Sequence, residues 1–238
     1  NSSIVRLLHA AMNAQGLSTY ARITGVVPRE LGPHGIRTIS RAAGAHVEEM
    51  RWWLRRLPVS VGGIVLENSA ISAEFQSLAA RWLRPDVTVL TNTLPDHQEL
   101  WGTSSESAAE VLVAGVPKKA RLVLPADLES DEYLMELLNR RHCQLIFSEP
   151  ASEAGEGYHA VNTGLALTTM ECLGLDNDSA LKAMLGLPDD RYDFHVARCG
   201  GAELAMAFSA NDITSTRNLF RSLTWSKAET RIIYNHRA

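Results

Sequence analysis

Apolar residues recur along this chain with two spacings, which predict where it is helical and where it is extended. Ile4, Leu8 and Met12 repeat at four-residue intervals, as one face of a helix does, and Gly16 is a natural stop for that helix. Short apolar runs rich in β-branched residues are typical of buried parallel strands. The predicted strands are 17–23, 63–67, 87–91, 121–124 and 144–147. The further predicted helices are 45–57, 72–83, 105–115, 130–141, 162–174 and 177–185.

The alternation of these strands and helices predicts an α/β fold, with a parallel sheet flanked by helices on both faces. Pro188-Asp189-Asp190 is the best candidate domain boundary, because the pattern changes beyond it. The segments that follow are two strands, a helix and a last strand, at 192–198, 203–208, 212–223 and 231–234. We expect one domain over 1–187 and the beginning of a smaller α/β domain over 188–238. Both ends look cut, so we also expect flanking segments that this sequence lacks.

Composition narrows the class of protein. A net charge of -4 and a pI near 6.1 leave no electrostatic footprint for nucleic acid. The three cysteines stand far apart without a CxxC pair, which argues against a zinc site and fits a reducing compartment. No apolar run approaches the roughly 18 residues that would cross a bilayer. We therefore expect a soluble, cytoplasmic protein that does not bind nucleic acid.

Polar side chains stand where two predicted strands end, which is where ligands bind in open α/β sheets. Glu67 closes the strand 63–67, and Asp96 and His97 follow the strand 87–91. A carboxylate and an imidazole from two strand ends could hold one divalent cation beside a nucleotide phosphate. On spacing alone, a helix cap for Asp96 and an ordinary surface histidine for His97 remain open.

Ser2 and Ser3 stand at the start of the first predicted helix, where ordinary N-cap residues are expected. A phosphate-binding loop also ends in Ser or Thr at a helix N-terminus, because backbone N–H groups and the helix dipole favour an anion there. The glycines of such a loop would lie upstream of this sequence. Both interpretations stay open on the residues alone.

Eight segments, taken in order along the chain, resemble motifs of the poly-γ-glutamate synthase ligases, a family of the Mur ligase superfamily. Residues 2–7 are similar to the end of that family's phosphate loop, GTRGKSSVTRL, and residues 162–167 to its ENVALAL segment. The other similar segments are 24–35, 39–49, 66–71, 84–102, 208–212 and 235–237. The resemblance covers essentially the whole chain. It implies a P-loop Mur-ligase central domain over 1–187 and the beginning of a C-terminal ligase domain over 188–238.

The resemblance also implies roles for particular residues. Glu67 and His97 would bind Mg²⁺ at the catalytic centre, with Ser2 as a further metal ligand. Ser2 and Ser3 would contact the phosphates of ATP, and Asn162 would lie near the adenine. Further candidates, on the acyl-substrate side, are Thr24, Arg29 and Arg41.

The reaction implied by the resemblance is ATP-dependent and forms ADP. A carboxylate of glutamate or poly-γ-glutamate is phosphorylated and an amine attacks the acyl phosphate, in capsule or exopolymer synthesis. We expect a homo-oligomer, with membrane-bound synthase subunits as candidate partners. Membrane association would then come through those subunits or through a missing N-terminal segment.

The sequence departs from the family pattern at its first residue. Asn1 falls where the family has the phosphate-loop lysine, which reaches the β- and γ-phosphates as a compact cation. The ligase activity is therefore expected to be weakened. The alternative is a degenerate, non-catalytic subunit that keeps the fold in order to bind a partner. A second alternative is a Mur-like ligase with another acceptor, such as a relative of folylpolyglutamate synthase.

Overall fold

The structure is a computed structural model that describes most of the chain as two compact units, Asn1–Asp189 and Asp190–Ala238. The described residues are 2–25, 27–41, 46–190, 192–208, 210 and 213–233, with the side chains of Gln98, Ile213 and Thr214 left aside. The assignment of the two units to ligase domains stays a prediction at this point.

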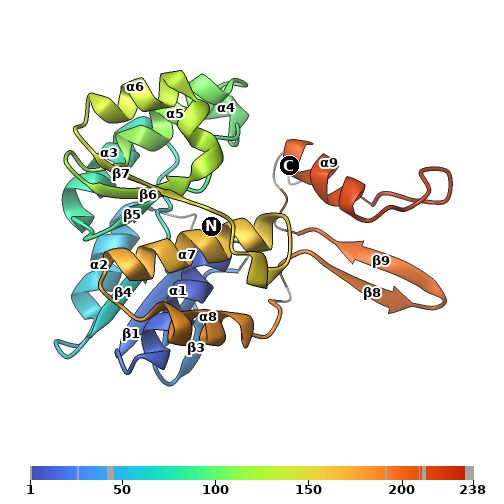
Figure 1. Ribbon diagram of the computed structural model, residues 1–238, viewed down its shortest axis with the longest axis horizontal. Helices are drawn as coiled ribbons and strands as arrows, with labels where there is room; N and C mark the ends of the chain where they lie inside the picture. The colour runs from blue at the N-terminus through green and yellow to red at the C-terminus, as the bar shows by residue number, and fades with distance from the viewer. Residues whose placement is uncertain are drawn as a thin grey trace. The chain divides into compact units, whose positions relative to one another are not determined.

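The first unit contains two sheets (Figure 1). One has the order β3-β2-β1-β4; β1 and β4 are parallel, and the β1–β2 and β2–β3 pairs are antiparallel. The other has the order β5-β6-β7 and is parallel throughout. The strands are β1 Thr19–Ile23, β2 Arg29–Gly32, β3 Gly35–Thr38, β4 Gly63–Leu66, β5 Thr88–Val89, β6 Arg121–Pro125 and β7 Gln144–Ser148.

Helices cover both faces of the β5–β7 sheet. Figure 1 shows α5 and α6 on one side, and α7 with α1 and α8 on the other. Ser72, Ser104, Asp131 and Asp176 begin helices by accepting a backbone N–H, as N-cap residues do. The helices are α1 Ser2–Ala14, α2 Glu48–Arg56, α3 Ala73–Leu83, α4 Gln98–Trp101, α5 Ser105–Ala114, α6 Glu132–Asn139, α7 Tyr158–Cys172 and α8 Asn177–Leu185. Short 3-10 turns lie at Ala126–Ser130 and Ser152–Ala154.

The core follows from the alternation of side chains along β6. Leu122 and Leu124 are buried in one apolar cluster with residues of α5 and α6. Val123, between them, is buried in a second cluster with residues of α1, α7 and α8. Successive strand residues face opposite sides of a sheet, so an unbroken apolar strand needs helices on both faces. The prediction of an α/β fold with parallel strands flanked by helices is confirmed.

The structure adds two details that the sequence analysis did not give. The described strands of the first unit form two sheets rather than one. The antiparallel hairpin of β2 and β3 was also not anticipated, because β3 is exposed along its whole length and carries no apolar run.

The second unit holds a hairpin and a helix. Strands β8 (His195–Cys199) and β9 (Ala202–Met206) pair in antiparallel fashion, and α9 spans Ile213–Ser222. The two-residue turn between the strands is Gly200-Gly201, both with positive φ, as the common hairpin turns require. Residues 231–233, part of a predicted strand, are irregular, and 234 lies outside the described residues. Among the described residues, no helix is long and apolar enough to span a bilayer.

Candidate active site

Glu67 lies where two parallel strands end at the same edge. Its Oε2 atom accepts the backbone N–H of Thr24 at 2.7 Å and the hydroxyl of Ser2 at 3.4 Å. The register of β1 and β4 pairs Arg22 with Leu66, so the residues after each strand emerge side by side. The Glu67 N–H continues the ladder by donating to the Arg22 carbonyl oxygen at 3.1 Å. Strand register therefore brings Thr24 and Glu67 together.

Ser2 reaches this carboxylate from the first turn of α1. The helix is fixed behind the strands by Val5, which is buried with Ala21 and Ile23 of β1. A Cβ atom at Gly25 would lie 2.7 Å from the Ser2 Oγ atom, so a glycine leaves the space that this approach needs. The first N–H groups of a helix lack partners within the helix and attract anions. We call Ser2, Thr24 and Glu67 the Glu67 cluster.

The Glu67 cluster has donors that suit a hard divalent cation. Mg²⁺ takes oxygen ligands at about 2.1 Å in octahedral geometry, which places neighbouring ligand oxygens about 3.0 Å apart. The Ser2 Oγ and Glu67 Oε2 atoms are 3.4 Å apart. The described residues contain no group of three or more His, Cys, Asp or Glu side chains that could hold a metal ion. A cation here would therefore need water or phosphate oxygens to complete its coordination, as Mg²⁺ commonly does.

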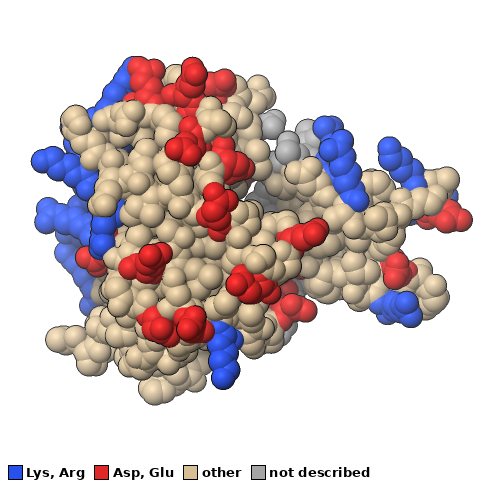
Figure 2. Space-filling view, viewed as in Figure 1, with Lys and Arg blue, Asp and Glu red and all other residues tan. Residues whose placement is uncertain are grey.

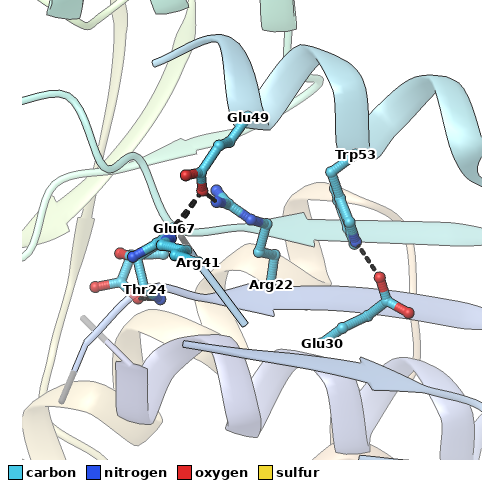
Figure 3. A network of polar contacts seen from close by, with 7 residues as sticks. All are labelled: Arg22, Thr24, Glu30, Arg41, Glu49, Trp53 and Glu67. Carbon is cyan, nitrogen blue, oxygen red and sulfur yellow. Dashed lines mark hydrogen bonds and ion pairs between the residues drawn. The ribbon is translucent and has the colours of Figure 1, made fainter. Parts of the chain in front are cut away.

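Beside this cluster lies a network of charged side chains from three elements (Figure 3). Glu49, in the first turn of α2, accepts from Arg22 of β1 and from the Nε atom of Arg41, the latter at 3.0 Å. Arg22 is only 1% exposed. Burial lowers the pKa of Arg22, whereas the carboxylates of Glu49 and Glu67 oppose that shift. The network ties α2 to β1 through buried charge.

The other substrate-side candidate, Arg29, begins β2. The antiparallel register places it opposite Ile23, directly before Thr24 in the chain. Farther along β2, Glu30 accepts the indole N–H of Trp53 at 2.5 Å and pairs with Arg37 at 2.8 Å. Arg29 therefore lies at the same end of β1 as the Glu67 cluster.

His97 has a different setting from the one predicted. Its strand, β5, pairs with β6, while β4 before Glu67 pairs with β1 in the other sheet. The premise that Glu67 and His97 leave neighbouring strands is therefore wrong. The ring of His97 packs edge-on against Trp101, with centroids 5.5 Å apart, and its Nε2 atom is 3.8 Å from Asp96 Oδ2. A shared metal ion at Glu67 and His97 stays a prediction.

The remaining predicted site residues lie on helices. Ser3 follows Ser2 in the first turn of α1, and Asn162 lies in the second turn of α7, half-buried. Their contacts with a nucleotide stay predictions. Asn1 lies outside the described residues, so its comparison with the phosphate-loop lysine is not addressed by the structure.

The sequence analysis missed Arg22 and Glu49 as site residues. Arg22 interrupts the otherwise apolar end of a strand, Ala21-Arg22-Ile23, and a charge in that position is a signal in itself. Charged residues are almost never fully buried unless they are paired, so such an arginine requires a carboxylate partner. That partner is Glu49, which lies 27 residues away in the chain. Its identity follows only from the fold.

The same fold occurs in solved ligase structures. MurF from Acinetobacter baumannii superposes with a TM-score of 0.65 at 11% identity, over 90% of this chain and 49% of that protein. Folylpolyglutamate synthase from Thermotoga maritima superposes with a TM-score of 0.60 at 12% identity, over 93% of this chain and 63% of that protein. A bifunctional folylpolyglutamate synthase/dihydrofolate synthase with Mn, AMPPNP and L-glutamate bound superposes with a TM-score of 0.65 at 15% identity, over 93% of this chain and 63% of that protein. The chain therefore has the fold of the Mur ligases and folylpolyglutamate synthases, as predicted.

Sequence comparison leads to more particular relatives. The chain is 24% identical over 236 residues to the PGA synthase CapB of Bacillus subtilis (strain 168), covering 92% of this chain and 60% of that protein. It is 23% identical over 239 residues to the capsule biosynthesis protein CapB of Bacillus anthracis, covering 92% and 50%. No model of a known protein family matches the chain. The chain is thus similar to the CapB proteins, which confirms the resemblance, and it spans 50–60% of their length.

Proposed function

We propose that this chain is the nucleotide-binding part of an ATP-dependent amide ligase that forms γ-glutamyl amide bonds in poly-γ-glutamate synthesis. The observation that carries the proposal is the Glu67 cluster. It places a carboxylate and a hydroxyl together at a helix start, in a fold shared with MurF and with a synthase that binds Mn, AMPPNP and L-glutamate. The relation to a PGA synthase supports the choice of polymer.

In this proposal the residues act by position and charge. Ser2 and Ser3 contact the ATP phosphates at the start of α1, where the N–H groups and the helix dipole favour anions. Glu67, Ser2 and His97 hold Mg²⁺, and Asn162 lies against the adenine. Bound Mg²⁺ would supply neutralisation of the negative charge on the phosphates. Phosphoryl transfer needs little else from a protein than alignment of the acceptor carboxylate and the phosphate.

The reaction that we propose has two stages. The γ-phosphoryl group of ATP passes to a carboxylate oxygen of glutamate or poly-γ-glutamate, which releases ADP. An amine nitrogen of a second glutamate unit then attacks the acyl carbon, and the acyl–oxygen bond breaks to release phosphate. Thr24, Arg29 and Arg41 lie on the acyl-substrate side of this site.

The proposal extends to organisation. Residues 1–187 serve as the Mur-ligase-type ATP-binding domain and 188–238 as the beginning of the C-terminal ligase domain. The protein works in the cytoplasm as a homo-oligomer, with membrane-bound synthase subunits as partners. The alternative of a non-catalytic subunit rested on Asn1 alone, and the relation to a PGA synthase favours the ligase.

Calorimetry on the full-length protein tests the nucleotide proposal. ADP should bind in the presence of Mg²⁺, and the affinity should fall when EDTA removes the metal. Phosphate release from ATP should also depend on added glutamate. If ADP and ATP fail to bind at millimolar concentration with Mg²⁺ present, corresponding to a binding free energy weaker than about -4 kcal/mol, the ligase proposal is overturned.

A further inference from the structure

Two arginines share one carboxylate beside the Glu67 cluster. The Nη2 atom of Arg22 and the Nε atom of Arg41 both donate to the Oε2 atom of Glu49, and the Arg41 Nη2 atom is 2.9 Å from the same oxygen. Arg22 is 1% exposed, and Arg41 and Glu49 are each 17% exposed. Figure 3 shows both guanidinium groups reaching one end of the Glu49 side chain.

The guanidinium groups of two arginines meet at the one carboxylate of Glu49. Arg22 and Arg41 carry two positive charges, and Glu49 carries one negative charge. The carboxylate of Glu67 is the other negative charge that acts on Arg22, and its hydrogen bonds with the Thr24 N–H and the Ser2 hydroxyl leave that charge in place. The two arginines and the two carboxylates therefore balance in charge, and the feature left to explain is an unpaired donor.

One hydrogen-bond donor of Arg22 lacks a partner in the part of the chain that the structure describes. The Nη1 atom of Arg22 is buried and has no hydrogen-bond partner among the described residues. Buried donors are normally satisfied, so an unpaired guanidinium nitrogen in a nearly inaccessible side chain needs an explanation. Arginine presents its donors in a planar fork that matches the two oxygens of a carboxylate. The unpaired donor of Arg22 therefore indicates a carboxylate as the ligand.

We propose that Arg22 and Arg41 form a carboxylate subsite that binds the γ-carboxylate of the glutamate substrate, with Glu49 holding the two guanidinium groups in place. This inference rests on the proposed function and deepens it. The subsite adjoins the Glu67 cluster through the backbone, because the Glu67 N–H donates to the Arg22 carbonyl oxygen.

Calorimetry with the full-length protein, saturated with Mg²⁺ and AMPPNP, tests the subsite. The probes are L- and D-glutamate, with the matching glutamine as an isostere whose side chain is neutral. The variants are Arg22→Lys, which keeps the charge but loses the fork, and Arg41→Gln, which removes a charge at a less buried position. Arg37→Gln is the matched control, because Arg37 is 70% exposed and pairs with Glu30.

The wild type should bind glutamate about tenfold more tightly than glutamine, as expected for one charge-assisted interaction. Arg22→Lys and Arg41→Gln should each weaken glutamate binding about tenfold and leave glutamine and AMPPNP binding within about twofold. Arg37→Gln should change neither. If Arg22→Lys does not fold, Arg41→Gln decides alone.

Three results would overturn the subsite: no preference for glutamate in the wild type, unchanged glutamate binding in the folded variants, or equal loss of glutamate and AMPPNP. The last result would mean that the arginines only support the fold around the nucleotide. Failure of the ligase proposal is a different result, because the wild type itself would then bind no Mg²⁺–nucleotide.

Discussion

Replacing Glu67 by Gln tests the chemistry of the Glu67 cluster with little change in shape. The amide oxygen of a glutamine can still accept the Thr24 N–H that Glu67 accepts at 2.7 Å. The negative charge is lost, however, and with it the attraction for a divalent cation. We expect Glu67→Gln to fold and to lose most of the Mg²⁺ dependence of nucleotide binding.

The cost to stability can be worked from the two hydrogen bonds. A bond to a charged group contributes about 1.5–3 kcal/mol and a neutral one about 0.5–1.5, so the 2.7 Å bond weakens by about 1 kcal/mol. The 3.4 Å bond from Ser2 is long and adds little. In a unit of this size, about 1 kcal/mol lowers Tm by about 2–4 °C. Glu67→Ala would cost more, because the Thr24 N–H would lose its acceptor.

The assay is ADP binding by calorimetry, in Mg²⁺ and in EDTA, with thermal unfolding of the same samples. Glu67→Gln should weaken ADP binding at least tenfold in Mg²⁺, equivalent to ~1.4 kcal/mol, and should change it little in EDTA. Glu74→Gln is the control, because it removes an exposed carboxylate in the first turn of α3.

The metal role of Glu67 would be refuted by either of two results. One is equal weakening in Mg²⁺ and in EDTA, since a metal ligand cannot act where no metal is present. The other is unchanged ADP binding in Mg²⁺ by a folded Glu67→Gln protein. Either result would leave Glu67 as a structural link between β4 and Thr24.

Two further predictions concern stability. Gly164→Ala should lower the unfolding free energy by about 1–3 kcal/mol, because the new Cβ would lie 2.0 Å from the Glu149 carbonyl oxygen. Thermal or urea unfolding measures this change. An unchanged or raised stability is what alanine gives at an open helix position, and it would contradict the packing of α7. Burial lowers the pKa of His9 from its ordinary 6.5. As the pH falls through about 6.5, the histidine is therefore protonated more readily in the unfolded state than in the folded state, and the free energy of unfolding decreases. Below about pH 6.5, the unfolding free energy measured with urea should fall less with pH in His9→Gln than in the wild type. An unchanged pH dependence would show that His9 is not responsible.

The sequence by itself determined most of the local elements of the first unit. The helix predicted at 177–185 is α8 with the same bounds, and the strand predicted at 121–124 is β6 short of one residue. Both elements were predicted from the spacing of neighbouring apolar residues, and this spacing can be read without knowing the rest of the chain. The β2–β3 hairpin was not predicted, because its strands are short and β3 is exposed, so it shows no apolar pattern.

The candidate site was only partly open to prediction. Glu67 and Ser2 could be singled out because one follows a strand and the other begins a helix. Their contact could not, since it depends on the register of β1 with β4 and on the packing of α1 behind them. His97 shows the same limit, because the pattern that placed it after a strand could not say which sheet that strand joins.

Only the tertiary structure decided the charge network. Arg22, Arg41 and Glu49 come from a strand, an irregular segment and a helix, and their ion pairs depend on how those backbones are placed. Periodicity is a property of adjacent residues and survives in any fold that buries the apolar face. An ion pair requires two side chains to meet within about 4 Å, and that distance is set by strand register and helix packing across the whole unit.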